Sequence, residues 1–295
     1  MSRDQSLQAL RREIDEVDDR IHDLIIRRTE VVREVSALKH DLKVKIRPTR
    51  EAEILYRLVG RHQGPFPKRE LVRIWRELIV ATLSMEGPFS VSVYVPEEGG
   101  GYWDLARDQY GSFTPMTAHG SMRRVIDSVR SQETTVGVLP LPRREDADPW
   151  WRYLATVNPE APRIIARLPL AGADSGRGER PEALVVCPVD QEPSSRDRTF
   201  MAFEAEGEIG LQRLESALSG AGFSPCFTAL WREADETGPW LYLAELDGFI
   251  APGERRLSTF AEGFEGLIYR TIPLGGYAVP FDHGELASED AGSGP

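Results

Sequence analysis

The stretch LQALRREIDEVDDRIHDLIIRRTEVVREVSALK (7–39) decides the fold of the N-terminal part of this 295-residue chain. Its apolar residues recur at alternating spacings of three and four, which predicts one long helix with a narrow apolar seam. The seam residues are Leu7, Leu10, Ile14, Val17, Ile21, Leu24, Val31, Val35 and Leu38. Such a seam is normally buried against another helix, so the pattern also predicts a partner helix.

A basic residue stands inside this seam. Arg28 occupies the position between Leu24 and Val31 where the spacing requires an apolar side chain, and a buried arginine needs an anion. Lys39 lies about 20° away from Arg28 around the helix and roughly 16 Å along its axis, so the two cations can close around one small ligand. Arg11 is about 42 Å from Lys39 along the axis and cannot belong to that pocket.

Arg11 therefore has two interpretations. If it is functional, it serves a second, symmetry-related pocket, which an antiparallel pair of these helices about a twofold axis provides. This interpretation predicts a homodimer formed through the N-terminal helices. In the alternative, Arg11 is a solvated surface residue, Lys39 is a charge at a helix end, and Arg28 extends its head group to solvent.

Two further helices are predicted before residue 87. Helix breakers in residues 5–86 are concentrated at RPTRE (47–51) and HQGPFP (62–67), which separate three helical segments. The second helix is expected to begin near Thr49 and the third at Pro67, because proline is well suited to a first helical turn.

Polar side chains interrupt the apolar faces of these two helices as well. Arg50 and Glu51 open the second helix, and Thr82 and Glu86 stand four residues apart on one face of the third. A pocket that combines Arg28 and Arg50 with few acids suits a small dianion, because carboxylates accept paired hydrogen bonds from guanidinium groups.

Beyond Gly87 the composition changes from helix formers to short apolar runs. The runs at 91–95, 134–141 and 183–189 predict strands, and residues 117–132 predict a helix, which together indicate a small α/β unit. From residue 198 onward the pattern is strand, helix, strand, strand and helix.

These patterns predict a multi-domain chain. An all-α domain of three helices at 1–87 is followed by an α/β region at 88–196, a small α+β unit at 197–282 and a disordered tail at 283–295.

The composition excludes several classes of function. A formal net charge of −11 argues against nucleic acid as the main partner, and no run approaches the roughly 20 apolar residues of a membrane span. The charged N-terminus lacks the apolar stretch of a secretory signal, so we expect a cytoplasmic location. The two cysteines and five histidines never fall in a metal-ligand spacing, so we expect no metal site.

The N-terminal segments resemble the all-helical chorismate mutases, specifically the mutase domain fused to prephenate dehydratase in bacterial bifunctional enzymes. The resemblance covers residues 7–86 through motifs in the family's order: LxALRxEIDxVDxxIxxLIxxR (7–28), ExxxxK (34–39), RExE (50–53) and WRELIVATLSME (75–86). It implies an intertwined homodimer that rearranges chorismate to prephenate in phenylalanine and tyrosine biosynthesis. This one-substrate pericyclic reaction needs neither a nucleophile nor a metal nor a cofactor.

The resemblance also implies how the substrate is bound. Arg28 and Arg11 of a partner chain would hold the two carboxylates, with Arg50 in support. Thr82 stands where the family has a carboxylate-binding serine, and Glu51 would accept a hydrogen bond from the ring hydroxyl.

Two residues carry the chemistry that the resemblance implies. Lys39 would donate to the ether oxygen on which negative charge develops, and Glu86 would donate to the same oxygen, for which its carboxyl must be protonated. We therefore expect activity to fall as pH rises. Some family members have an acid where this chain has Arg47.

The remainder resembles the dehydratase fusion. VSVYVPEEGG (91–100) and GVLPLPRRED (137–146) stand at two dehydratase motifs, but the catalytic Thr-Arg pair and Glu-Asn-Ser set are missing, so we expect dehydratase activity to be lost. Residues 198–250 resemble the ferredoxin-like ACT domain, with EIGL (208–211) and GPWLYL (238–243) at its motif positions. Most phenylalanine-binding residues are absent, which leaves an aromatic amino acid effector open.

Two other functions remain as alternatives. A non-catalytic dimeric sensor or regulatory scaffold would bind a small acid without turning it over. The other alternative is a chain that still makes phenylpyruvate from prephenate, which the missing Thr-Arg pair argues against.

Overall fold

The computed structural model describes residues 3–38, 45–158, 160–172, 181–233 and 238–287. It confirms three N-terminal helices: α1 (Arg3–Ala37), α2 (Pro48–Arg61) and α3 (Lys68–Glu86). The boundaries follow the expected breakers, because α2 begins at Pro48 and α3 directly follows Pro67.

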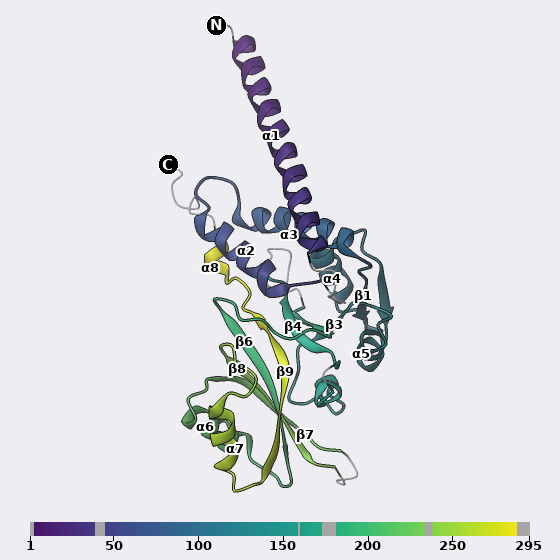
Figure 1. Cartoon of the computed structure of the whole chain (residues 1–295), viewed down its shortest axis with the longest axis vertical. Helices are drawn as coiled ribbons and strands as arrows, with labels where there is room; N and C mark the ends of the chain where they lie inside the picture. The colour runs from purple at the N-terminus through teal and green to yellow at the C-terminus, as the bar shows by residue number, and fades with distance from the viewer. Residues whose placement is uncertain (1–2, 39–44, 159, 173–180, 234–237, 288–295) are drawn as a thin grey trace.

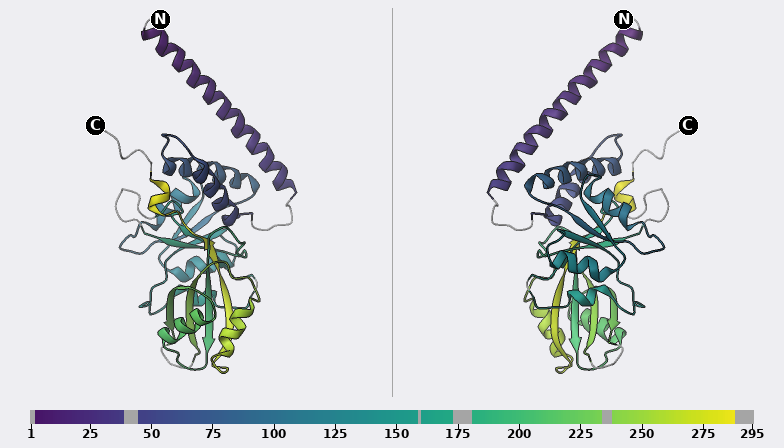
Figure 2. Two further views of the ribbon diagram at one scale, coloured as in Figure 1. Left: turned by 90° about the vertical axis from the view of Figure 1, so that its left-hand side faces the viewer. Right: turned by 90° about the vertical axis from the view of Figure 1, so that its right-hand side faces the viewer.

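Helix α1 projects away from the rest of the molecule, as two orthogonal directions of view show (Figures 1 and 2). Its apolar seam is correspondingly exposed: the exposed fraction is 60% for Ile14 and 68% for Leu24. Only its C-terminal part approaches α3, where Arg28 bonds to the carbonyl of Leu78. The predicted helix is therefore present, and its predicted partner helix stays a prediction.

In the described part of the chain, nine strands form one sheet, in the order β2-β1-β3-β5-β4-β9-β6-β8-β7. In its first part β1 pairs in parallel with β2 and β3, whereas β5 is antiparallel to β3 and β4. The elements of this part are β1 (Val91–Tyr94), α4 (Tyr102–Tyr110), β2 (Met116–His119), α5 (Met122–Arg130), β3 (Val136–Pro140), the 3-10 helix η1 (Trp150–Leu154), β4 (Arg163–Leu168) and β5 (Ala183–Cys187).

The second part of the sheet has the βαββαβ order of a ferredoxin-like unit, with antiparallel strands in the order β9-β6-β8-β7. Its elements are β6 (Asp197–Ala205), α6 (Leu211–Gly220), β7 (Pro225–Trp231), β8 (Trp240–Asp247), α7 (Arg255–Glu262) and β9 (Ile268–Ala278). The two parts join where β4 and β9 pair at Ile164 and Gly275. Gly275 has φ +98°, and a Cβ there would collide with the Ile164 backbone, so the junction requires glycine.

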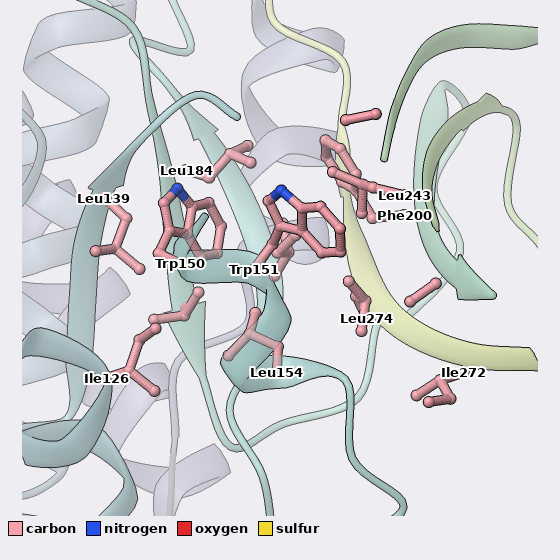
Figure 3. Close-up of a cluster of buried hydrophobic side chains, with 14 of the residues drawn as sticks. Ile126, Leu139, Trp150, Trp151, Leu154, Leu184, Phe200, Leu243, Ile272 and Leu274 are labelled. Carbon is pink, nitrogen blue, oxygen red and sulfur yellow. The ribbon is translucent and has the colours of Figure 1, made fainter. Parts of the chain in front are cut away.

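The two faces of the ferredoxin-like sheet are covered differently. Helices α6 and α7 pack on one face, with Leu214 and Phe260 in the core between them and the strands. On the other face, Trp151 of η1 packs beside Leu274 and Phe200 of the ferredoxin-like strands, and Trp150 lies near Leu139 and Leu184 of the α/β part in the same cluster (Figure 3). A segment of the α/β part thus completes the core of the ferredoxin-like part.

The structure corrects two sequence expectations. Residues 117–132 were expected to be helical, but Met116–His119 form the edge strand β2, because parallel pairing with β1 satisfies their backbone groups. The tail predicted to be disordered from residue 283 begins with the helix α8 (His283–Leu286). Asp282 and Glu285 form a capping box around its first turn, and Leu286 is buried against the α2 side chains.

The elements α4, η1, β4 and β9 were also not expected from the sequence. Residues 288–295 of the predicted tail lie outside the described residues. The division of the chain at residues 87 and 196 stays a prediction, while the sheet itself runs across the second boundary through β4 and β9.

Candidate functional site

A cavity of about 290 Å³ lies where the C-terminal half of α1 meets the start of α2 and the end of α3. Apolar side chains of all three helices form part of its wall, including Val31, Ile54 and Leu83. The polar lining residues are Arg28, Lys45, Arg47, Arg50, Glu51, Thr82 and Glu86. Five of the seven predicted site residues are thus brought together: Arg28, Arg50, Glu51, Thr82 and Glu86.

Arg28 is the basic residue that α1 contributes to this cavity. Its Nη1 donates to the Leu78 carbonyl at 3.3 Å and to Thr82 Oγ1 at 3.4 Å. The Thr82 hydroxyl can donate its one proton to the Ile79 carbonyl at 2.9 Å or to the Leu78 carbonyl at 3.1 Å, and the same proton can turn toward a bound ligand. Burial lowers the pKa of the Arg28 guanidinium, and a bound anion would compensate that loss of hydration.

Glu51 is a buried acid in the wall of the cavity. Its Oε2 accepts a hydrogen bond from Arg76 Nη1 at 2.7 Å, and both side chains are almost fully buried. Arg50, the preceding residue of α2, is exposed, and Glu86 near the end of α3 is partly exposed. The two acids therefore differ, because Glu51 has a fixed ionic partner and Glu86 faces the cavity near solvent.

Of the other two predicted residues, one lies away from this cavity and one lies outside the described residues. Arg11 lies on the exposed part of α1, 17 residues before Arg28, which corresponds to about 26 Å along the helix axis. Lys39 lies outside the described residues. Within one chain, Arg11 therefore cannot contact a ligand that Arg28 holds.

Sequence reasoning missed two basic residues around the site and the partner of a third. Lys45 donates to Ser36 Oγ at 3.2 Å, and Arg76 holds Glu51. Arg47, at the position where some relatives of the mutase family were expected to have an acid, bonds Glu192 at 2.9 Å. The partner of Arg47 lies 145 residues away in the chain, so no local pattern could reveal the pair.

The charges of the cavity favour a small anion. Arg28, Arg50 and Lys45 provide cations from three different segments, and a flat carboxylate accepts two parallel hydrogen bonds from one guanidinium. Across the described parts of the chain, no group of three or more His, Cys, Asp or Glu residues is arranged to hold a metal ion. Nor is any helix among the described residues long and apolar enough to cross a membrane.

Comparison with known proteins confirms the resemblance of the N-terminal segment. Residues 10–87 match the family model of chorismate mutase type II. The chain is 31% identical over 147 residues to the bifunctional chorismate mutase/prephenate dehydratase of Stutzerimonas stutzeri, a match that covers 48% of this chain and 40% of that enzyme. For the enzyme of the same name from Pseudomonas aeruginosa the identity is 28% over 147 residues, with the same two coverages.

The chain spans less than half the length of these curated relatives. Among solved structures, a prephenate dehydratase from Streptococcus mutans has a TM-score of 0.47 and 13% identity, covering 65% of this chain and 98% of that chain.

Proposed function

We propose, from the type II chorismate mutase match of residues 10–87, that this chain rearranges chorismate to prephenate in the cavity between α1, α2 and α3. The observation that carries the proposal is the convergence of Arg28, Arg50, Glu51, Thr82 and Glu86 on one cavity from three helices of the matching segment. Prephenate and chorismate are both small dianions, the kind of ligand that clustered guanidinium groups select.

In the proposed mechanism, some residues bind the substrate and others donate hydrogen bonds to its ether oxygen. Arg28 and Arg11 of a partner chain bind the two carboxylates, with support from Arg50 and the Thr82 hydroxyl. They select the compact conformer in which the reacting carbons approach each other. Glu51 accepts a hydrogen bond from the ring hydroxyl. Lys39 and a protonated Glu86 donate to the ether oxygen as its C–O bond breaks, so they stabilise charge that develops only in the transition state.

The exposed seam of α1 supports a homodimer as part of this proposal. Leu7, Leu10 and Ile14 are all more than two-fifths exposed, a large apolar stripe for a single helix. An antiparallel partner helix would cover the stripe and bring Arg11 of one chain to the cavity of the other. The dimer therefore supplies the second carboxylate-binding arginine that each single chain lacks.

The regions after the helices are proposed to be a degenerate dehydratase-like region at 88–196 and an ACT-like unit at 197–282. The βαββαβ order supports the second assignment. The missing Thr-Arg pair and Glu-Asn-Ser set support the loss of dehydratase activity. Whether an aromatic amino acid acts as effector through the ACT-like unit stays open in this proposal.

The experiment follows the loss of chorismate by its ultraviolet absorbance for the full-length chain and for Lys39→Ala, with Arg73→Ala on an exposed position of α3 as the matched control. We expect rapid loss in the wild type and the control, strong reduction in Lys39→Ala, and phenylpyruvate only after acid treatment of the product. Binding of chorismate without turnover would instead favour the sensor function. Phenylpyruvate without acid treatment would show that dehydratase activity is retained.

A further inference from the structure

Arg76 is a buried arginine behind the wall of the mutase cavity. It sits on α3 with 6% of its surface exposed, and its guanidinium therefore needs charge compensation inside the protein. Nη1 donates to Glu51 Oε2 at 2.7 Å, and the two side chains are 8% and 11% exposed. The pair is thus shielded from water on both sides, while the Glu51 side chain also lines the cavity.

The same guanidinium makes a second contact, to a different part of the fold. Nη2 donates to the backbone carbonyl of Gln109 at 3.1 Å. Gln109 is the penultimate residue of α4, whose last carbonyls have no partner within their own helix. A helix C-terminus also favours a nearby cation. Arg76 therefore bridges a cavity-lining acid of α2 and the end of a helix of the α/β part.

We propose that Arg76 is a positioning residue for Glu51, held in turn by the C-terminal end of α4, so that the α/β part supports the mutase cavity. This inference rests on the proposed function. A lone glutamate at the start of α2 has several rotamers. The hydrogen bond from Arg76 Nη1 favours one of them, and the second bond, from Nη2 to the Gln109 carbonyl, holds the guanidinium itself in place. The carboxylate is then already oriented when the ring hydroxyl of the substrate arrives.

The role of Arg76 gives it a distinct energetic signature. If it acts through Glu51, its removal matters only while the Glu51 carboxylate is present, so the two substitutions must be non-additive. If Arg76 merely stabilises the packing of α3, its removal lowers activity by the same factor with or without Glu51. A double-mutant cycle on kcat/KM separates the two cases.

The experiment compares full-length wild type, Arg76→Met, Glu51→Ala and the double variant in chorismate turnover, with circular dichroism to verify folding. Arg76→Met should lower kcat/KM about 10- to 100-fold, the range expected for a misplaced contact group. In the Glu51→Ala background the same change should cost less than about threefold. The matched control Arg73→Met removes an exposed arginine one turn earlier on α3 and should stay within about twofold of wild type.

A second variant keeps the test decisive if Arg76→Met fails to fold. Arg76→Lys retains the charge, but a single ammonium cannot reproduce the planar two-nitrogen geometry toward Glu51 and the Gln109 carbonyl. It should lose activity to a smaller extent, again only when Glu51 is present. Equal losses in both Glu51 backgrounds, or no loss at all, would overturn the role of Arg76. A wild type without any turnover would refute the proposed function and this role with it.

Discussion

The geometry of α1 predicts that two inactive variants restore each other's activity. Arg11 and Arg28 lie about 26 Å apart on one straight helix, so a pocket that uses both must take them from different chains. Arg11→Ala and Arg28→Ala each remove one carboxylate contact from every pocket of their own dimers. A hybrid dimer of the two variants has one pocket with both arginines intact and one pocket with neither.

The size of the recovery follows from this arrangement. Loss of one buried charged hydrogen-bond partner costs at least about 2 kcal/mol, so each variant alone should retain no more than roughly 3% of wild-type kcat/KM. After random pairing of equal amounts, half of the dimers are hybrids and about one pocket in four is intact. The mixture should therefore recover about a quarter of wild-type activity, roughly eight times that of either parent.

The assay is the chorismate absorbance assay after the two variants are unfolded together in urea and refolded. Arg28→Ala mixed with Thr82→Ala is the matched control, because Arg28 and Thr82 meet within one chain at 3.4 Å and no hybrid pocket is then intact. This control should show no recovery. If the Arg11 and Arg28 mixture also stays at the level of its parents, the shared pocket is wrong.

Other consequences are also measurable. Glu86→Ala should lower kcat, because it removes a donor to the ether oxygen, whereas the amide of Glu86→Gln can still donate; a kcat of Glu86→Ala equal to that of the wild type removes Glu86 from this role. Trp150→Phe should lower the free energy of unfolding, measured in urea, by about 1 kcal/mol more than Trp151→Phe. The reason is that Trp150 Nε1 donates to the Pro140 carbonyl at 3.0 Å, whereas Trp151 Nε1 has no partner among the described residues. Burial raises the pKa of the Cys187 thiol from its ordinary value of 9.0 to about 12. The buried neutral thiol therefore contributes to the free energy of unfolding below about pH 9, and this contribution is lost as pH rises toward 12. A thiol reagent at pH 8 should accordingly label exposed Cys226 in the native protein and Cys187 only after unfolding; rapid native labelling of both would contradict the burial of Cys187.

The N-terminal helices could be predicted because their information is local. The seam spacing, the breakers at 47–51 and the proline before α3 lie within a few residues of the structure they determine. Placing Arg28, Thr82 and Glu86 on inward faces requires only the helical period. The five residues that meet in the cavity were predictable for the same reason.

The missed features depend on contacts between distant segments. Arg76 resembles any other charged residue of α3 until α2 and α4 enclose it, 25 residues before it and 33 residues after it. Strand β9 contains Pro273 and two consecutive glycines, which locally argue against a strand. Glycine is required at position 275 because its backbone lies against that of Ile164 in β4, a contact that the local sequence does not reveal.

The three helices that line the cavity differ in how they are attached to the body of the molecule. Helix α2 is tied to the body because the Tyr56 hydroxyl donates to the Val279 carbonyl and Glu53 accepts from the Ser195 backbone amide. Helix α3 is tied through Arg76 to the end of α4. Helix α1 lines the cavity with Arg28, Val31, Val32 and Val35, and the part of its seam before Arg28 is exposed. In the proposed dimer, a partner helix on the seam and an anion on Arg28 both hold α1 in place, so we expect substrate binding and dimer formation to be coupled.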